Sequence, residues 1–269
     1  MRRIGTTPFA FPEFRGATRQ LIIWNLVAYF VLAIGLLVSP STARRWAAIL
    51  AFDPIVFLHG AIWQPITYSF IHLTLLGTLL ELLSLWFLAG FLEEMHGRNW
   101  VIGLYAVSVL GTALAAVALL FGGRAMGIDA APALLTGCFG GIFGLLVAIG
   151  LLYGEMEFLL FFTIGIKARY IAVIYGLVAI AMLFGAQRMY AFAELGGALA
   201  GWLYIRSAPR RGFTFLLSES LYGLRNRYYR WKRRKAAKKF EVYMRKQGRT
   251  MHFDGSGRQL DDDDKKNWN

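Results

Sequence analysis

Long, uninterrupted apolar runs limit what this chain can fold into more than any other feature. About 20 helical residues cross the hydrocarbon layer of a bilayer, and several runs here reach that length. The chain is 57% hydrophobic and 17% charged, so the runs are too long and too many for the core of a water-soluble domain. The sequence therefore predicts an all-α membrane protein with six spans, near residues 20–39, 69–92, 99–122, 132–153, 170–186 and 189–206.

The distribution of basic residues predicts the orientation of these spans. Lys and Arg are abundant in the N-terminal segment, residues 1–19, and in the tail, residues 207–269. The segments expected on the opposite side of the membrane hold few basic residues, namely Arg44, Arg45, Arg124 and Arg188. By the positive-inside tendency, both termini are expected in the cytoplasm, flanking a membrane domain of residues 20–206. We expect an integral protein of the bacterial inner membrane.

Two apolar segments do not fit the pattern of simple spans. The connection 40–68 is rich in Trp, Phe and Ile, which predicts an outer loop lying at the headgroup boundary. The segment FLLFFTIGIKAR, residues 158–169, is too short to cross the bilayer and return. We expect it to lie along the inner surface.

The tail combines a basic, helix-favouring stretch with an acidic end. Its cations are expected to hold anionic lipid headgroups from a cytoplasmic helix. Nucleic-acid contact is a weaker alternative, because no binding motif accompanies the charges. The acidic run 261–264 predicts a solvated end, although DDDDK also matches an engineered cleavage tag. The basic residues proposed for anionic surface binding are Arg225, Arg227, Arg230, Lys232, Arg233, Arg234 and Lys235.

Glycines recur at three- and four-residue spacings in the fourth and sixth expected spans. Such spacings place small residues on one helix face, where backbones can approach closely in lipid. We therefore expect these two spans to pack against each other. The glycines expected in this contact are Gly140, Gly141, Gly144, Gly196, Gly197 and Gly201.

Four segments in this order resemble the rhomboid superfamily, whose active members are intramembrane serine proteases. They are WQPITYSFIHLTLLGTLLELLSLWFLAGFLEEMHG, GCFGGIFGLL, FFTIGIKARYIAVIYG and AELGGALAGWLYIR, and the resemblance covers roughly residues 20–206. It implies a six-helix rhomboid-like bundle.

The positions that match the family's active site carry other residues. The family's Gly-x-Ser-Gly falls on Gly137, Cys138, Phe139 and Gly140, so phenylalanine stands at the position of the nucleophile. Glu194 stands where the family has its histidine base.

The second span departs from the family in the same way. His72 is kept, but Gly77 and Glu81 replace the family's second His and its Asn, which help to hold the oxyanion. A hydrolase of this class needs a nucleophile, a base and oxyanion donors. We therefore expect no enzymatic activity, and we expect Phe139 to fill the former active site as packed core.

Two functional classes remain open. The first is a pseudoprotease that binds or scaffolds membrane proteins as an accessory subunit. The second is an ion- or proton-handling protein that uses Glu81 and Glu194, because intramembrane carboxylates are functional candidates by default. Either carboxylate could instead be neutral and hydrogen-bonded to the backbone, or lie close enough to the membrane surface to be hydrated. His72 together with these two glutamates is too small a set of ligands to predict a metal site, so no metal or cofactor is expected.

The expected partners are lipids and the transmembrane helices of other proteins, held in a stable complex. In the family, substrate helices approach between the second and fifth spans. Here that face would be formed by Leu75, Leu79 and Leu82 with Ile174, Leu177 and Ile180. All six are apolar, so such a contact would depend on shape.

Overall fold

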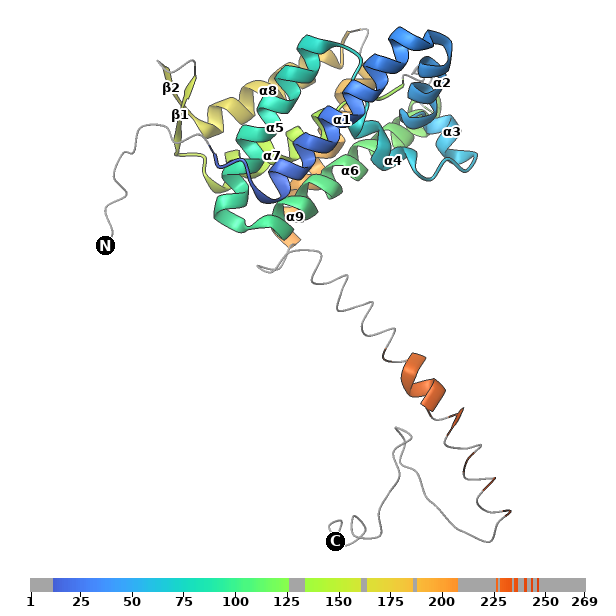
Figure 1. The fold of residues 1–269 in the computed structure, drawn as a ribbon. Helices are drawn as coiled ribbons and strands as arrows, with labels where there is room; N and C mark the ends of the chain where they lie inside the picture. The colour runs from blue at the N-terminus through green and yellow to red at the C-terminus, as the bar shows by residue number, and fades with distance from the viewer. Residues whose placement is uncertain are drawn as a thin grey trace, which may run out of the picture. The chain divides into compact units, whose positions relative to one another are not determined.

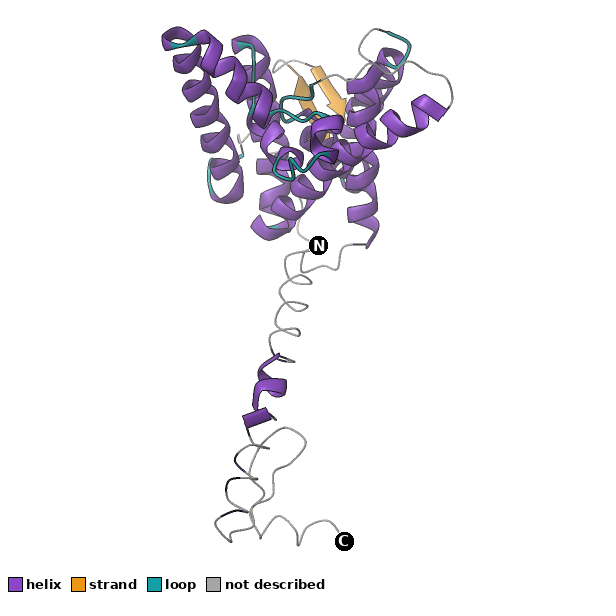
Figure 2. Ribbon diagram, turned by 90° about the vertical axis from the view of Figure 1, so that its right-hand side faces the viewer, coloured by secondary structure: helices purple, strands orange, loops and turns teal. Residues whose placement is uncertain are grey.

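The structure is a computed structural model of the whole chain. It describes residues 12–125, 134–160, 164–185 and 188–207, and in the tail residues 226, 228–233, 235, 236, 240, 243 and 246. Contacts divide the chain into two compact units, Met1–Phe213 and Thr214–Asn269. The described parts are predominantly helical (Figure 2).

Three helices are long and apolar enough to cross a membrane. They coincide with the first three expected spans: α1 (Gly16–Val38), α5 (Leu75–His96) and α6 (Arg98–Ala125). Helices α7 (Phe139–Leu152) and α8 (Ala168–Met182) are apolar but shorter, and α9 (Arg188–Ser207) carries charged residues. Helices therefore form at all six expected positions, and three of them have the length and apolarity of a full span.

Two helices begin later than the sequence predicted. Helix α7 starts at Phe139 because Leu135 pairs with Phe52 in an isolated antiparallel bridge and Gly137 has φ +89°. That left-handed backbone conformation interrupts any helix before it. Helix α5 starts at Leu75, after the short 3₁₀ helix η1 (Tyr68–Phe70).

The connection 40–68, expected as an outer loop, folds into short helices rather than an irregular loop. These are α2 (Pro40–Leu50), α3 (Pro54–Leu58) and α4 (Gln64–Thr67). Proline begins α2 and α3, and Asp53 caps α3 by accepting hydrogen bonds from Ile55 N and Val56 N. The side chain of Thr67 donates to Leu50 O at 2.7 Å, which ties α4 to the end of α2.

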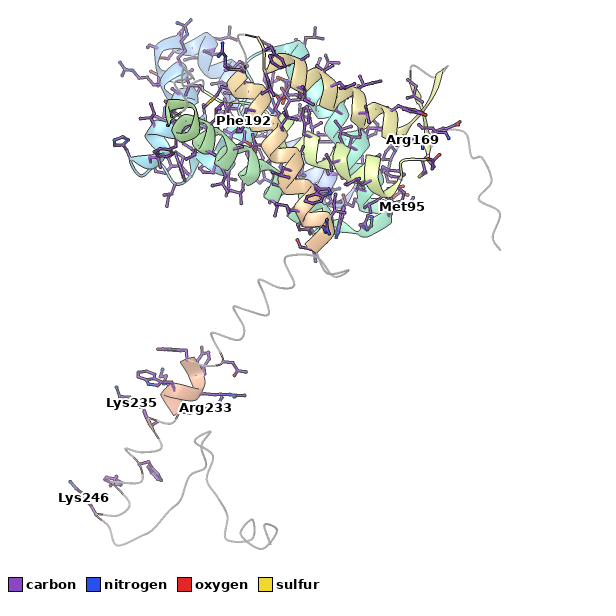
Figure 3. The ribbon with its side chains drawn as sticks, turned by 180° about the vertical axis from the view of Figure 1, so that it is seen from behind. Met95, Arg169, Phe192, Arg233, Lys235 and Lys246 are labelled. Carbon is purple, nitrogen blue, oxygen red and sulfur yellow. The ribbon has the colours of Figure 1, made fainter. Side chains whose placement is uncertain are left out.

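The segment expected along the inner surface contains a pair of strands, so the all-α prediction was wrong there. Strands β1 (Glu157–Leu160) and β2 (Ile164–Lys167) pair antiparallel, with Glu157 opposite Lys167. We call the unit Met1–Phe213 the membrane unit. Figure 1 places the two strands at one end of it, while α2 to α4 gather at the opposite end. Arg169, at the start of α8, lies beside this pair (Figure 3). Glu155 accepts hydrogen bonds from Lys167 and Arg169 just before β1.

The centre of the membrane unit is a three-helix seam of α6, α7 and α9. All three contact one another, and glycines let them approach. A Cβ added to Gly201 on α9 would lie 2.8 Å from Gly144 Cα on α7. A Cβ added to Gly140, Gly141 or Gly144 would instead overlap α6 side chains. Thus α9 and α7 do pack together, but most of the α7 glycines meet α6, which the sequence analysis left out of the contact.

Glu93 fixes the start of α1. Its carboxylate accepts hydrogen bonds from Ala17 N at 2.7 Å and from Thr18 N at 2.8 Å and Thr18 Oγ1 at 2.7 Å. A carboxylate at a helix N-terminus satisfies free amides and complements the helix dipole. The motif that resembles rhomboids therefore includes a structural contact between α5 and α1.

In the tail, Arg230, Lys232, Arg233 and Lys235 are helical and exposed. The side chains of Arg233 and Lys235 extend from this helical segment (Figure 3). The other basic residues proposed for anionic surface binding, Arg225, Arg227 and Arg234, lie outside the described residues.

Candidate functional site

A buried polar chain runs from α1 to the N-terminus of α7. Asn25 donates its amide N–H to Leu21 O at 2.7 Å, which leaves its Oδ1 free to accept. His72, between η1 and α5, places Nε2 2.9 Å from Asn25 Oδ1. Because an amide oxygen can only accept, this His72 nitrogen carries a proton.

The other face of His72 points at Glu81. His72 Nδ1 lies 3.4 Å from Glu81 Oε2 and has no hydrogen-bond partner among the described residues. The two side chains are 1% and 10% exposed. Glu81 Oε2 also accepts the backbone N–H of Cys138 at 2.7 Å. The carboxylate thereby joins the middle of α5 to the residue preceding α7.

Gly137 gives this carboxylate room to approach. Its φ is +89°, and an added Cβ would lie 2.7 Å from Glu81 Oε2. Its N–H donates to Tyr68 O at 3.1 Å. Glycine at this position therefore serves both the backbone turn and the close contact.

A cavity of about 430 Å³ lies between α5, α7, α8 and α9. Its polar wall includes Glu81 and Glu194, so the structure brings the two glutamates to one cavity. Thr136 and Tyr190 also line it, and Tyr190 donates a hydrogen bond to Leu134 O. Its apolar wall consists of Phe139, Phe143, Tyr175, Val178, Ala179 and Met182.

The expectation that Phe139 forms packed core was wrong. Its side chain is 38% exposed and lines the cavity. The reason is its position as the first residue of α7, where the helix emerges from the Gly137 turn and has no preceding turn to cover it. The position that the resemblance assigns to the nucleophile thus faces an open space, and its side chain has no hydroxyl.

Gly77, at the other position of the family's oxyanion residues, lies outside this group. It is half-buried in the first turn of α5, and an added Cβ would meet Thr74 Oγ1 at 2.5 Å. Glycine at this position therefore allows the close local packing of Thr74 at the start of α5. Of the two positions that the resemblance assigns to oxyanion residues, only Glu81 therefore belongs to the polar group.

Sequence reasoning missed two members of the site. Asn25 is fully buried in the first span and sets the tautomer of His72, and an amide inside an apolar run was the available signal. The Cys138 side chain belongs to the same buried group, since donor atoms of His72, Glu81 and Cys138 lie within 4.8 Å of one another. Neither the contact between Asn25 and His72 nor the approach of Cys138 to Glu81 could be derived from sequence spacing, because these residues come from different segments of the chain.

The expected helix-binding face is partly exposed. Leu79 on α5 and Leu177 on α8 are 53% and 60% exposed, respectively. Leu82 is buried in the main core, so its assignment to this face was wrong. Its side of α5 packs against the protein, and an apolar helix in lipid gives no sequence signal that separates a protein-facing from a lipid-facing leucine.

Comparison with known proteins places this architecture in a family. The model of a family described as eukaryotic integral membrane protein, DUF1751, matches residues 22–208, most of the chain. Rhomboid-like protein 19 of Arabidopsis thaliana is 27% identical over 208 residues, which cover 75% of this chain and 62% of that protein. The chain thus spans less than two-thirds of that relative's length.

These findings bear on two of the expectations. They agree with the rhomboid-like resemblance and with an integral membrane protein. The eukaryotic description of the family counts against the expected bacterial inner membrane. The chain belongs to the DUF1751 family of eukaryotic integral membrane proteins, and its similarity to Rhomboid-like protein 19 supports membership of the rhomboid-like superfamily.

Proposed function

We propose that this protein is a rhomboid-like pseudoprotease that binds a transmembrane helix of another membrane protein without cutting it. The observation that carries the proposal is the hydrogen bond that Glu81 accepts beside the cavity. Its carboxylate accepts the Cys138 N–H beside the cavity, at a position where the family resemblance implies a donor to an oxyanion. A carboxylate there repels a developing negative charge instead of stabilising it.

The loss of chemistry extends to the other matching positions. Phe139 brings no heteroatom to the cavity wall, and Glu194 replaces the expected base. Serine hydrolysis requires the nucleophile, the base and the oxyanion donors together. The replacements therefore remove each part of that machinery.

An apolar face remains beside the altered site. Leu79 and Leu177 are exposed on α5 and α8, and Glu81 and Val178 from the same helices line the cavity. A helix docking on Leu79 and Leu177 would lie where the resemblance implies substrate entry. Helix packing in lipid depends on shape and close contact, so this face would select partners by fit.

Six spans with both termini in the cytoplasm are part of the same proposal. The basic tail would then lie beside the anionic cytoplasmic leaflet, where each cation near the surface contributes about 1 kcal/mol. Two weak contacts on one molecule, the apolar face and the tail, would raise the effective concentration of a bound partner. The protein would act as an accessory subunit of a long-lived membrane complex.

Site-specific photocrosslinking tests the helix-binding face. A photocrosslinker replacing Leu79 or Leu177 should capture a foreign transmembrane protein in native membranes. Leu114 on α6 is 63% exposed and provides a matched control position, which should yield lipid adducts. Capture of lipid and self alone at positions 79 and 177 would contradict the proposal.

Deletion of residues 218–269 tests the contribution of the tail. Capture at position 177 should weaken, and raising the salt concentration should weaken capture by the full chain but leave capture by the truncated chain unchanged. Equal capture by both chains at low and high salt would show that the tail does not contribute to partner binding.

A second candidate function is proton or cation handling by Glu81 and Glu194. It is favoured by their shared cavity wall. Beyond Glu81 along α5, however, the side chain of Ser84 already donates a hydrogen bond to Leu80 O, at 2.8 Å, and residues 85–92 are apolar, which separates Glu81 from the polar end of the helix at residues 93–96. A proton flux in liposomes that Glu81→Gln abolishes would favour this function over helix binding.

A further inference from the structure

The buried group formed by His72, Glu81 and Cys138 has a property that neither proposed function uses. His72 Nε2 carries the proton that Asn25 Oδ1 accepts, so a neutral His72 presents a bare lone pair at Nδ1. That lone pair faces Glu81 Oε2 at 3.4 Å, in a side chain that is 1% exposed. Two acceptors cannot face each other in a buried site unless a proton or a cation lies between them.

The group offers the donors that a thiophilic divalent cation prefers. Imidazole nitrogen, carboxylate oxygen and thiolate sulfur are all zinc ligands. The donor atoms of the three residues lie within 4.8 Å of one another, and all three residues are buried. Tetrahedral zinc places its ligand atoms about 3.3 to 3.8 Å apart. The Nδ1 to Oε2 separation of 3.4 Å already falls in this range, and the Cys138 sulfur, within 4.8 Å of the other two donors, would move inward to become the third ligand.

Asn25 and Leu21 supply the outer support that metal-binding histidines need. A ligating histidine usually donates its other N–H to a fixed acceptor, which sets its tautomer and ring orientation. Asn25 is that acceptor, and its own amide orientation is fixed by the bond from Nδ2 to Leu21 O. This support comes from α1, outside the three ligands, and is therefore an independent sign that His72 Nδ1 is held ready as a ligand.

We propose that His72 Nδ1, Glu81 and the Cys138 thiolate bind one divalent transition-metal ion of the zinc class. On binding, the Cys138 thiol loses its proton to solvent and the sulfur forms a bond to the metal, while Glu81 contributes a carboxylate oxygen. Of the three ligands, Glu81 lines the cavity, so we expect the ion to enter past this carboxylate and to take a water from the cavity as its fourth ligand. The ion would link α5 to the start of α7 and would not require any catalytic reaction.

Cobalt(II) titration of the purified full-length chain in lipid nanodiscs tests the proposal directly. We expect one Co²⁺ per chain, with a thiolate-to-cobalt charge-transfer band and the intense d–d absorption of tetrahedral coordination. Zn²⁺ should displace the cobalt, and Mg²⁺ should not. Because Cys138 is the chain's one cysteine, a thiolate band reports this residue even where Cys138→Ser fails to fold.

Matched variants separate this site from adventitious binding. His72→Ala should lower Co²⁺ affinity at least about tenfold, and the positioning variant Asn25→Leu should lower it by about the same factor. His59 and Glu94 are exposed, so His59→Ala and Glu94→Gln should leave the spectrum and affinity unchanged. Absence of a thiolate band in folded wild-type protein at saturating Co²⁺, or a band unaltered by His72→Ala, would overturn the proposal. Neither outcome would bear on helix binding.

Discussion

At the scale of single residues, Glu81 is the most unusual side chain of this protein, because it is a buried carboxylate within an apolar helix. A carboxylate in a membrane span costs roughly 2.5 to 3.5 kcal/mol on insertion scales, so it needs compensating contacts. Here it accepts the Cys138 N–H, faces His72 Nδ1 and packs against Gly137. The sequence identified Glu81 as a candidate, but the contacts that stabilise it come from residues more than 50 positions away or from another segment.

Gly137→Ala should destabilise the protein by about 2 kcal/mol. Alanine is strained at φ +89°, and its Cβ would lie 2.7 Å from Glu81 Oε2. Denaturation midpoints in detergent measure the effect. Gly122→Ala is the control, because nothing lies within 4 Å of an added Cβ there. An unchanged midpoint for Gly137→Ala would contradict the described turn.

Glu81→Gln and Glu194→Gln should affect stability non-additively. Both carboxylates line one cavity, and interacting neighbours show coupling energies above about 0.5 kcal/mol in double-mutant cycles. The cycle uses the free energies of unfolding of the two single variants and the double variant. Additivity within about 0.5 kcal/mol would mean that the two groups do not interact across the cavity.

At the scale of helices and strands, the sequence predicted where helices form better than where they begin and what they contact. Hydrophobic runs located α1 and α5 to α9, the helices at the six expected span positions, because length and apolarity are direct signals. The start of α7 depends on the bridge between Leu135 and Phe52, and β1 pairs with β2 in a segment that reads as continuously apolar. Both are tertiary or cross-strand pairings, which a hydrophobic run does not record.

Gly144→Ala should destabilise the three-helix seam by about 1 to 3 kcal/mol through overpacking. An added Cβ would overlap the Ser108 side chain on α6. Ser108→Gly should therefore rescue Gly144→Ala in part, which a double-mutant cycle on thermal unfolding would detect. If Ser108→Gly adds its own loss with no rescue, α6 and α7 do not meet at these residues.

Glu155 provides a pH-dependent contact between the end of α7 and β2. The hydrogen bond from Lys167, at 2.8 Å, and the charge of Arg169 lower the pKa of this carboxyl below its usual range. Because the folded pKa is depressed, the contact contributes to stability above the unfolded pKa and is lost as pH falls through the folded pKa. The group is exposed, so the contribution is small.

Carboxyl ¹³C chemical shifts measured across a pH titration would follow the protonation of Glu155. Lys167→Ala should raise the pKa toward its ordinary value, whereas Lys167→Arg should keep much of the depression. An identical titration in wild type and Lys167→Ala would show that this lysine does not hold the carboxylate.

At the scale of the whole molecule, the chain resembles rhomboids, whereas the residues at the positions that match the family's active site differ from the family's. Resemblance alone placed Phe139, Glu81 and Glu194 at the family's active-site positions, and the structure brings all three to one cavity. The cavity itself could not be predicted, because the sequence suggested that an aromatic side chain would fill it. Its persistence depends on where α7 begins and on how α8 and α9 close around it.

The central claim is that this rhomboid-like site does not hydrolyse peptide bonds. The most direct test incubates the purified chain in liposomes with transmembrane substrates of active rhomboids and with a fluorophosphonate probe, beside an active rhomboid as positive control. We predict no cleavage and no labelling for the wild type. Phe139→Ser should also be inactive, because Glu81 and Glu194 remain. Substrate cleavage by the wild-type chain that the probe inhibits would contradict the account.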